Sequence, residues 1–268
     1  MADKVRLGGM ALPNGVLVHG PTAWACAVRR EDGAVVVAAE RKRFRTDERT
    51  PPLLRGPMKL LEALAVLPAM RRALPDARLP FERPSVLGAM LASAVAVRVV
   101  RGSRRLNAPA QELASALVSF VPAVLALRSS ELAGYHGAEH VSIGTYEHGE
   151  PRAKEHERCG SHLVGPILVT TAVGQALAVK APAPVRPAAR ALATLGALGV
   201  STEIFAWMVR NPRHPVAEAL SRPGHELQHR VGTDEPSPEQ LEVAEAALRA
   251  CLELEQPDSS PRRTPPMP

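Results

Sequence analysis

Hydrophobic positions follow a short, strand-like pattern near the start of the chain. Between residues 15 and 40, apolar stretches fall at 15–19, 23–29 and 34–39, which are typical lengths for β-strands. Glu31-Asp32-Gly33 separates the last two and is placed as a hairpin turn. We therefore predict two or three antiparallel strands within a small β-containing region at residues 1–50.

After this region the pattern becomes helical. Residues 53–74 carry leucines at helical intervals, which predicts an amphipathic helix that is interrupted or ends near Pro68. Ser237-Pro238-Glu239-Gln240 has the features of a helix start, with serine as N-cap, and an apolar face follows it. That face consists of Leu241, Ala244, Leu248 and Leu252. We predict a mainly α protein (α+β) with a helical body over residues 51–255 and a disordered, proline- and serine-rich tail at 256–268.

The helical body contains four strongly apolar segments, at residues 86–100, 113–127, 163–179 and 191–209. A helix needs about 20 apolar residues to cross a bilayer, with about 17 as the lower end. The first segment contains Arg98, the second is short, the third contains Pro166 and the fourth carries Glu203. The sequence leaves two interpretations open: a membrane-associated helical bundle, or helices buried in a protein core.

The charges between the first two segments complicate a simple four-span topology. If all four segments span, both termini share one side, and Arg101, Arg104 and Arg105 face the opposite side. Positive residues prefer the cytoplasmic side, so the first pair could instead form a re-entrant or peripheral hairpin.

Composition narrows the class of partner. The chain has a net charge of +6 and 3% aromatic residues, and its arginines are scattered without aromatics between them. That arrangement argues against nucleic acid and favours the lipids of an anionic membrane surface. Cys26, Cys159 and Cys251 offer no disulfide framework, which indicates a reducing compartment. No signal-peptide pattern is found in residues 1–10, so we expect the amino terminus in the cytoplasm.

Candidate chemistry is concentrated in residues 135–163, which hold five of the nine histidines, five glutamates and Cys159. Within them, His136, Glu139 and His140 spell H-x-x-E-H, the order in which inverted zincins present two imidazole ligands. Residues four apart lie on one face of a helix, so both imidazoles can reach one ion. A divalent metal, with zinc as our expectation, would then have Glu139 beside it as a general base for hydrolysis of an amide or ester.

The remaining ligands are open. Glu147 lies on the same helical stripe, but it would be roughly 16 Å from His136 along a continuous helix. His156, Cys159 and His162 follow a polar stretch whose Gly149 and Pro151 would let the chain fold back. Glu203, an acid within an apolar segment, is a further candidate ligand or supporting residue.

These motifs resemble the YqhQ-like family of predicted metal-dependent enzymes, which are membrane-associated bacterial proteins of undetermined activity. The resemblance is carried by Tyr135-His136-Gly137-Ala138-Glu139-His140, Tyr146-Glu147-His148-Gly149 and Cys159-Gly160-Ser161. Further landmarks are Gly8-Gly9-Met10-Ala11, Gly20-Pro21, Leu54-Arg55-Gly56 and Glu235-Pro236. The resemblance implies a metal-dependent enzyme in the bacterial cytoplasmic membrane. If all four segments span, we expect the motif and both termini on the cytoplasmic side, where Cys159 would stay reduced.

This chain departs from the family pattern in several places. Asn14 replaces an acidic residue, His19 an arginine, Val141 a lysine and Glu157 a proline. Thr202-Glu203 lies where the family shows a Tyr-Glu pair.

Three functions remain after this reading. The first is a membrane-associated zinc hydrolase, with peptides among the candidate substrates. His136 and His140 would be zinc ligands, and the coordination sphere would be completed by His156, Cys159 or Glu203. The second is a non-catalytic assembly protein with a structural His/Cys metal site. The third is a helical membrane protein without metal. The sequence names no substrate.

Overall fold

The computed structural model describes residues 4–47, 49–103, 105–128 and 130–256. Four strands form one antiparallel sheet in the order β1-β2-β3-β4. They are β1 (Gly8–Leu12), β2 (Gly15–His19), β3 (Ala23–Arg29) and β4 (Val35–Arg41). The three predicted strands are confirmed, and the turn after β3 contains Gly33 at φ 86°.

The prediction of at most three strands is wrong by one, because β1 was not expected. Two glycines begin this strand, and glycine has a low preference for strands. The strand is stabilised by pairing with β2, which runs from Gly8 opposite His19 to Leu12 opposite Gly15. The local sequence of β1 alone does not favour a strand.

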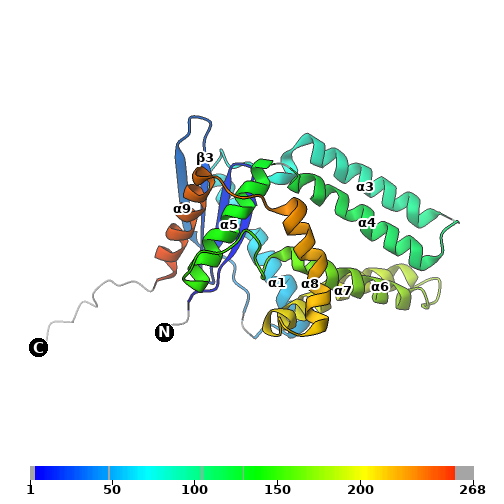
Figure 1. Ribbon diagram of the computed structural model, residues 1–268. Coiled ribbons are helices and arrows are strands. Elements are labelled where there is room, and N and C mark those ends of the chain that lie inside the picture. The colour runs from blue at the N-terminus through cyan, green and yellow to red at the C-terminus, as the bar shows by residue number, and fades with distance from the viewer. Residues whose placement is uncertain (1–3, 48, 104, 129, 257–268) are drawn as a thin grey trace, which may run out of the picture.

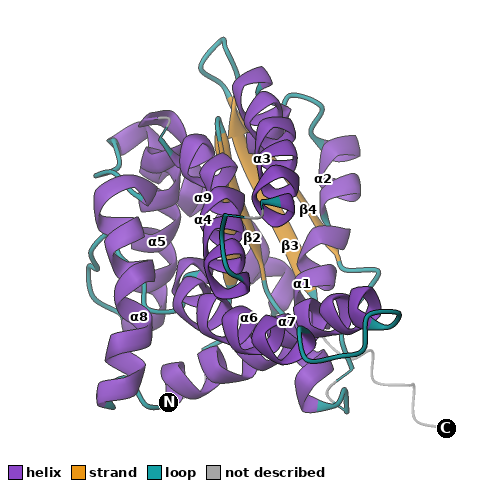
Figure 2. Cartoon of the chain, turned by 90° about the vertical axis from the view of Figure 1, so that its right-hand side faces the viewer, coloured by secondary structure: helices purple, strands orange, loops and turns teal. Residues whose placement is uncertain are grey.

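The sheet is covered on both faces, as Figures 1 and 2 show. Alternate residues of β3 point in opposite directions. Ala25 and Ala27 join a core formed with α5 (Ser130–His148) and α9 (Pro238–Glu255). Trp24, Cys26 and Val28 join a second core on the other face, formed with α2 (Leu67–Ala73) and the segment after it. Burial on both sides explains why the strand reads as a continuous apolar run.

The predicted amphipathic helix at 53–74 is present as two pieces. They are α1 (Pro52–Ala65) and α2, which meet at Val66, and Pro68 lies in the first turn of α2. A proline is tolerated there because that N–H has no partner within the helix in any case.

The four apolar segments form two helical hairpins that extend away from the sheet (Figure 1). They are α3 (Pro84–Gly102) with α4 (Ala108–Leu127), and α6 (Val164–Ala178) with α7 (Arg186–Arg210). Each hairpin contains two of the four segments that are long and apolar enough to cross a membrane. Only 6% of the α3 window and 28% of the α6 window are buried inside the protein. The interpretation as buried core helices therefore does not fit.

The remaining elements connect the hairpins to the sheet. They are two 3₁₀ turns, η1 (Pro80–Glu82) and η2 (Gly160–Leu163), the helix α8 (Pro215–Leu227) and a π-helical turn, η3 (Gln228–Gly232). The predicted capping box before α9 is confirmed, with the Ser237 side chain accepting from the Gln240 N–H. The fully buried residues of α9 are Val243, Ala244, Ala247 and Cys251, so its inward face is rotated from the one predicted. Arg104 and all of the predicted tail except Gln256 lie outside the described residues.

Candidate metal centre

Helix α5 carries the H-x-x-E-H motif and is fixed between the sheet and the segment before α9. Two glycines make this close fit possible. A Cβ added at Gly137 would lie 2.1 Å from the carbonyl oxygen of Asp234, and one at Gly134 would lie 2.5 Å from the Gln240 amide. The helix is therefore rigidly placed by contacts with residues about a hundred positions away.

His136 and His140 present their rings side by side, with centroids 4.3 Å apart. The Nδ1 of His136 lies 2.7 Å from the carbonyl oxygen of Gly232, and the Nδ1 of His140 lies 2.6 Å from that of Lys154. Each Nδ1 must carry the hydrogen, since a carbonyl can only accept. Both Nε2 atoms then keep a free lone pair, which is how metal-binding histidines are commonly oriented.

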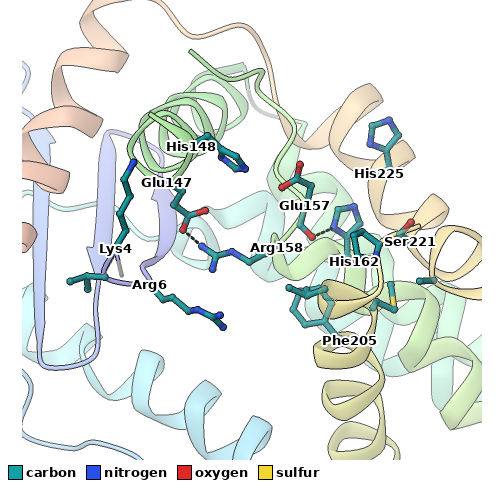
Figure 3. Close-up of a pocket in the computed structure, with 15 residues that line it drawn as sticks. Lys4, Arg6, Glu147, His148, Glu157, Arg158, His162, Phe205, Ser221 and His225 are labelled. Carbon is teal, nitrogen blue, oxygen red and sulfur yellow. Dashed lines mark hydrogen bonds and ion pairs between the residues drawn. The ribbon is translucent and has the colours of Figure 1, made fainter. Parts of the chain in front are cut away.

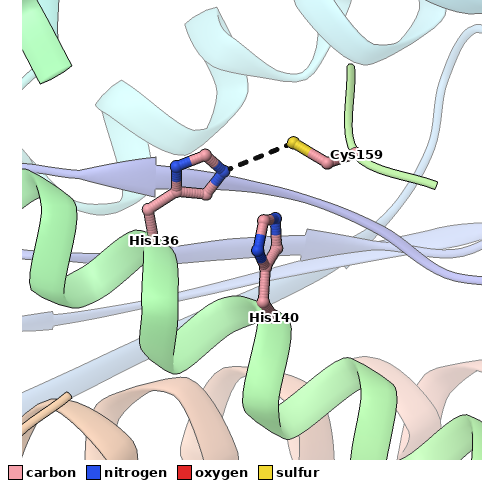
Figure 4. A group of neighbouring side chains, drawn as sticks. All are labelled: His136, His140 and Cys159. Atoms are coloured by element: carbon pink, nitrogen blue, oxygen red, sulfur yellow. Dashed lines mark hydrogen bonds between the residues drawn. The ribbon is translucent and has the colours of Figure 1, made fainter. Parts of the chain in front are cut away.

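Cys159 completes a group of three (Figure 4). Its Sγ lies 3.6 Å from Nε2 of His136, and the ligand atoms of His136, His140 and Cys159 lie within 4.8 Å of one another. The chain reaches this position by turning back after α5, where Gly149 has a φ of 79°. The expected return of the chain through the polar stretch therefore occurs.

A single glutamine fixes the returning loop. The side chain of Gln228 accepts from the His156 N–H at 2.9 Å and donates to Ser161 Oγ at 2.7 Å. Lys154, whose carbonyl holds His140, donates through Nζ to the carbonyl of Thr233 at 3.1 Å. Gln228 is 1% exposed, so these bonds are shielded from water and hold Cys159 in place.

Glu139 lies beside the three ligands in a buried position. Its carboxylate packs against β1, where a Cβ on Gly9 would come within 2.4 Å of Oε1. Burial raises the pKa of Glu139 to about 7, and the nearby His136 opposes that rise. A carboxyl group with this pKa can exchange a proton near neutral pH.

The protonation states of the ligands also suit a cation. Burial, followed by the neighbouring His136, lowers the pKa of His140 to about 2, so its ring stays neutral. Burial raises the pKa of the Cys159 thiol. A metal would have to displace that proton, as metals do when they bind cysteine.

His19 is a site residue that the sequence analysis missed. It lines the same small cavity, about 150 Å³, as His136, Glu139, His140 and Cys159. The Nδ1 of His19 faces Lys42 Nζ at 3.1 Å, and Lys42, 2% exposed, pairs with Glu62 at 2.7 Å. An ammonium group can only donate, so Nε2 of the neutral His19 ring carries the hydrogen. The sequence signals were a histidine that ends an otherwise apolar strand and its replacement of the arginine in the family pattern.

His156 and Glu203 are placed differently from the three ligands. The ring of His156 is near His140, with centroids 5.5 Å apart, but both of its nitrogens have partners. Nδ1 accepts from the Arg158 N–H and Nε2 faces Glu147 at 3.2 Å. Glu147 also pairs with Arg158. Glu203 lies on α7 and does not line the cavity.

Fold and site together describe a small sheet-containing body with a His/His/Cys group, attached to four helices of membrane length. Residues 114–254 match a family described as "Protein of unknown function (DUF1385)". The match covers more than half of the 268 residues, so the chain belongs to this family, which is the family that the YqhQ-like motifs indicated. No curated protein and no solved structure matches the chain. The family description names no activity.

Proposed function

We propose that the protein is a membrane-associated, zinc-dependent hydrolase. The observation that carries this proposal is that one ligand atom each of His136, His140 and Cys159 lies within 4.8 Å of the others, while both histidine Nδ1 atoms are bonded to backbone carbonyls. Two imidazoles and one thiolate form a donor set that zinc uses in proteins. The residues present therefore fit the metal.

The number of ligands favours catalysis over a closed structural site. Structural zinc sites use four protein ligands, whereas catalytic sites use three and keep one position open. The group in the described part of the chain has three members. His156 would act by supporting Glu147 and Arg158, since both of its ring nitrogens already have partners.

The roles of the neighbouring residues follow from whether each can donate or accept a proton. A bound zinc ion would supply Lewis-acid chemistry, which acidifies water and polarises a carbonyl group. Glu139, with a pKa of about 7, would take the proton from the attacking water. His19 lines the same cavity, and its Nε2–H would donate to an oxygen that gains negative charge.

Metal analysis and one isosteric substitution test this proposal. We expect stoichiometric zinc in purified full-length protein, and loss of that zinc in His136→Ala and His140→Ala. His229→Ala is the matched control, because His229 is on the surface and pairs with Glu155. Absence of zinc, iron and manganese from the wild-type protein would rule out the metal centre.

Glu139→Gln separates a catalytic site from a structural one. The amide keeps the size of the side chain but cannot take a proton. We expect zinc to be retained and hydrolysis of a fluorogenic peptide library or of nitrophenyl esters to fall about 10²-fold or more, the usual contribution of general-base catalysis. Active Glu139→Gln protein would show that Glu139 is not the base.

For the location, we propose the bacterial cytoplasmic membrane, with the sheet, the metal centre and both termini on the cytoplasmic side. Two hairpins bring the chain back to its starting side, and the three cysteines are free. Thiol labelling of a cysteine introduced at Val37, which is 41% exposed on β4, in intact cells and in inverted vesicles measures this orientation. Labelling from outside intact cells would reverse the proposed orientation.

A further inference from the structure

A second, larger cavity of about 810 Å³ lies next to the candidate metal centre (Figure 3). Arg158 lines both cavities and directly precedes Cys159 in the chain. The two cavities are therefore neighbours, separated by Arg158. The size of the larger cavity is within the range of sites that hold small organic ligands.

One wall of this cavity has an excess of positive charge. Lys4, Arg6 and Arg158 line it, and in Figure 3 the side chains of Arg6 and Arg158 extend toward each other from opposite directions. The two acids on the wall are already occupied, since Glu147 pairs with Arg158 and Glu157 pairs with Arg152 at 2.9 Å. Arg6 has no carboxylate partner among the described residues, and Lys4 donates to the carbonyl of Tyr146. Two cationic groups are left for an anion.

The opposite wall is apolar and belongs to a membrane-length helix. Phe205, Met208 and Val209 line it, and they form the last turns of α7, whose candidate span ends at Arg210. The cavity thus lies where a spanning α7 would leave the hydrocarbon and enter the headgroup layer. A molecule bound there would contact cations at one end and an apolar helix at the other.

We propose that this cavity binds an anionic phospholipid, with its phosphate at Lys4 and Arg6 and its acyl chains along the end of α7. Guanidinium groups match the geometry of phosphate oxygens, and basic pockets beside membrane helices bind lipid headgroups. As a statement about the substrate class of the neighbouring metal centre, the proposal rests on the proposed function. Lipid binding itself does not require the metal.

The test measures lipid retained by the full-length protein. Purified protein in neutral detergent is titrated with phosphatidylglycerol or with phosphatidylcholine, and bound lipid is counted by native mass spectrometry. We expect a preference for phosphatidylglycerol, and a loss of about five- to tenfold in its affinity in each of Arg6→Gln and Lys4→Gln. Both side chains are exposed, so these variants should fold. Arg210→Gln is the control, because Arg210 lies at the same end of α7 but does not line the cavity.

Three results would overturn the lipid proposal. The first is equal retention of the two lipids by the wild-type protein. The second is an equal loss of affinity in Arg210→Gln, which would indicate diffuse surface charge. The third is that inorganic phosphate, added without lipid, stabilises the protein and also abolishes its preference for phosphatidylglycerol. That result would indicate a site for a free anion. Zinc is measured in the same samples. A wild-type protein that holds zinc but shows no lipid preference refutes the lipid site alone. A wild-type protein that prefers phosphatidylglycerol but holds no metal refutes the metal centre alone.

Discussion

The sheet-containing body and the four apolar helices place their hydrophobic residues in opposite ways. In the body, Trp24 on β3 is 1% exposed, and it packs with residues of α2 and the following segment. In α3, Leu91 is 72% exposed and Val95 is 64% exposed. The body follows the rule for proteins in water, whereas the helices show apolar surface on a scale that soluble monomers avoid.

The contacts that the four apolar helices make with one another and with α1 also differ from those in the body. They depend on small residues and on hydroxyl groups bonded to the backbone, as is usual when lipid is the solvent. A Cβ on Gly199 of α7 would lie 2.4 Å from the carbonyl of Leu53, and Thr170 of α6 donates to the carbonyl of Ala197 at 3.2 Å. The comparison indicates that the two regions suit different surroundings, with water around the body, which holds the candidate metal centre, and apolar surroundings for the four helices.

Truncating one large side chain in each region gives the largest predicted contrast. Trp24→Ala removes a fully buried ring and should lower the free energy of unfolding by about 3–5 kcal/mol. Leu91→Ala removes a side chain that few protein atoms contact, so the change should stay within about 0.5 kcal/mol. Denaturant melts in detergent measure both. Equal losses would mean that α3 is packed against protein.

Placing a charge on each surface reverses the contrast. Leu91→Arg should impair membrane insertion by about 2.5–3.5 kcal/mol, the cost of arginine near the centre of a span. Val37→Arg on β4 is the control, since Val37 is 41% exposed on the body and should tolerate arginine. The measurement is the fraction of protein recovered in carbonate-washed membranes. Normal insertion of Leu91→Arg would contradict a spanning α3.

The pH dependence of stability should come from the body. Burial, followed by Lys42, lowers the pKa of His19 to about 4 from 6.5. Between these values the unfolded chain binds a proton that the folded chain does not, so stability present above pH 6.5 is lost as the pH falls toward 4. The loss from this residue is at most roughly 3 kcal/mol.

His19→Gln isolates that contribution, because glutamine does not titrate. We expect its melting temperature to fall less than that of the wild-type protein between pH 7.5 and pH 5, values chosen at about one unit or more to either side of 6.5. His140 also has a lowered pKa and contributes in both proteins. Identical pH dependence would show that folding does not lower the pKa of His19.

Two glycine substitutions give the smallest predicted effects, and they should have opposite signs. Gly9→Ala brings a Cβ to 2.4 Å from Oε1 of Glu139, so it should destabilise the protein by about 1–3 kcal/mol and displace the carboxylate. Gly88→Ala on α3 meets nothing within 4 Å and should stabilise the helix by about 0.5–1 kcal/mol. Thermal melts and retained zinc are the readouts. Stabilisation by Gly9→Ala would contradict the packing of Glu139 on β1.

Local patterns predicted much of the architecture. The strands β2 to β4, the break near Pro68, the apolar segments and the capping box at Ser237 all depend on neighbours within a few residues. For β1 the same reasoning failed, because Gly8 and Gly9 weaken the sequence pattern expected of a strand. Both glycines are needed for close packing at the candidate site. Gly9 leaves room for Glu139, and Gly8 leaves room for the ring of His19.

The amino-acid sequence alone determined that His136 and His140 lie one helical turn apart with Glu139 beside them, and that four segments are long enough to meet lipid. Only the tertiary structure brought Cys159 and His19 to these residues, gave His156 other partners and placed Glu203 outside the cavity. Helical spacing is fixed by the backbone over four residues. Contacts such as Gln228 with His156, by contrast, depend on how the whole chain packs.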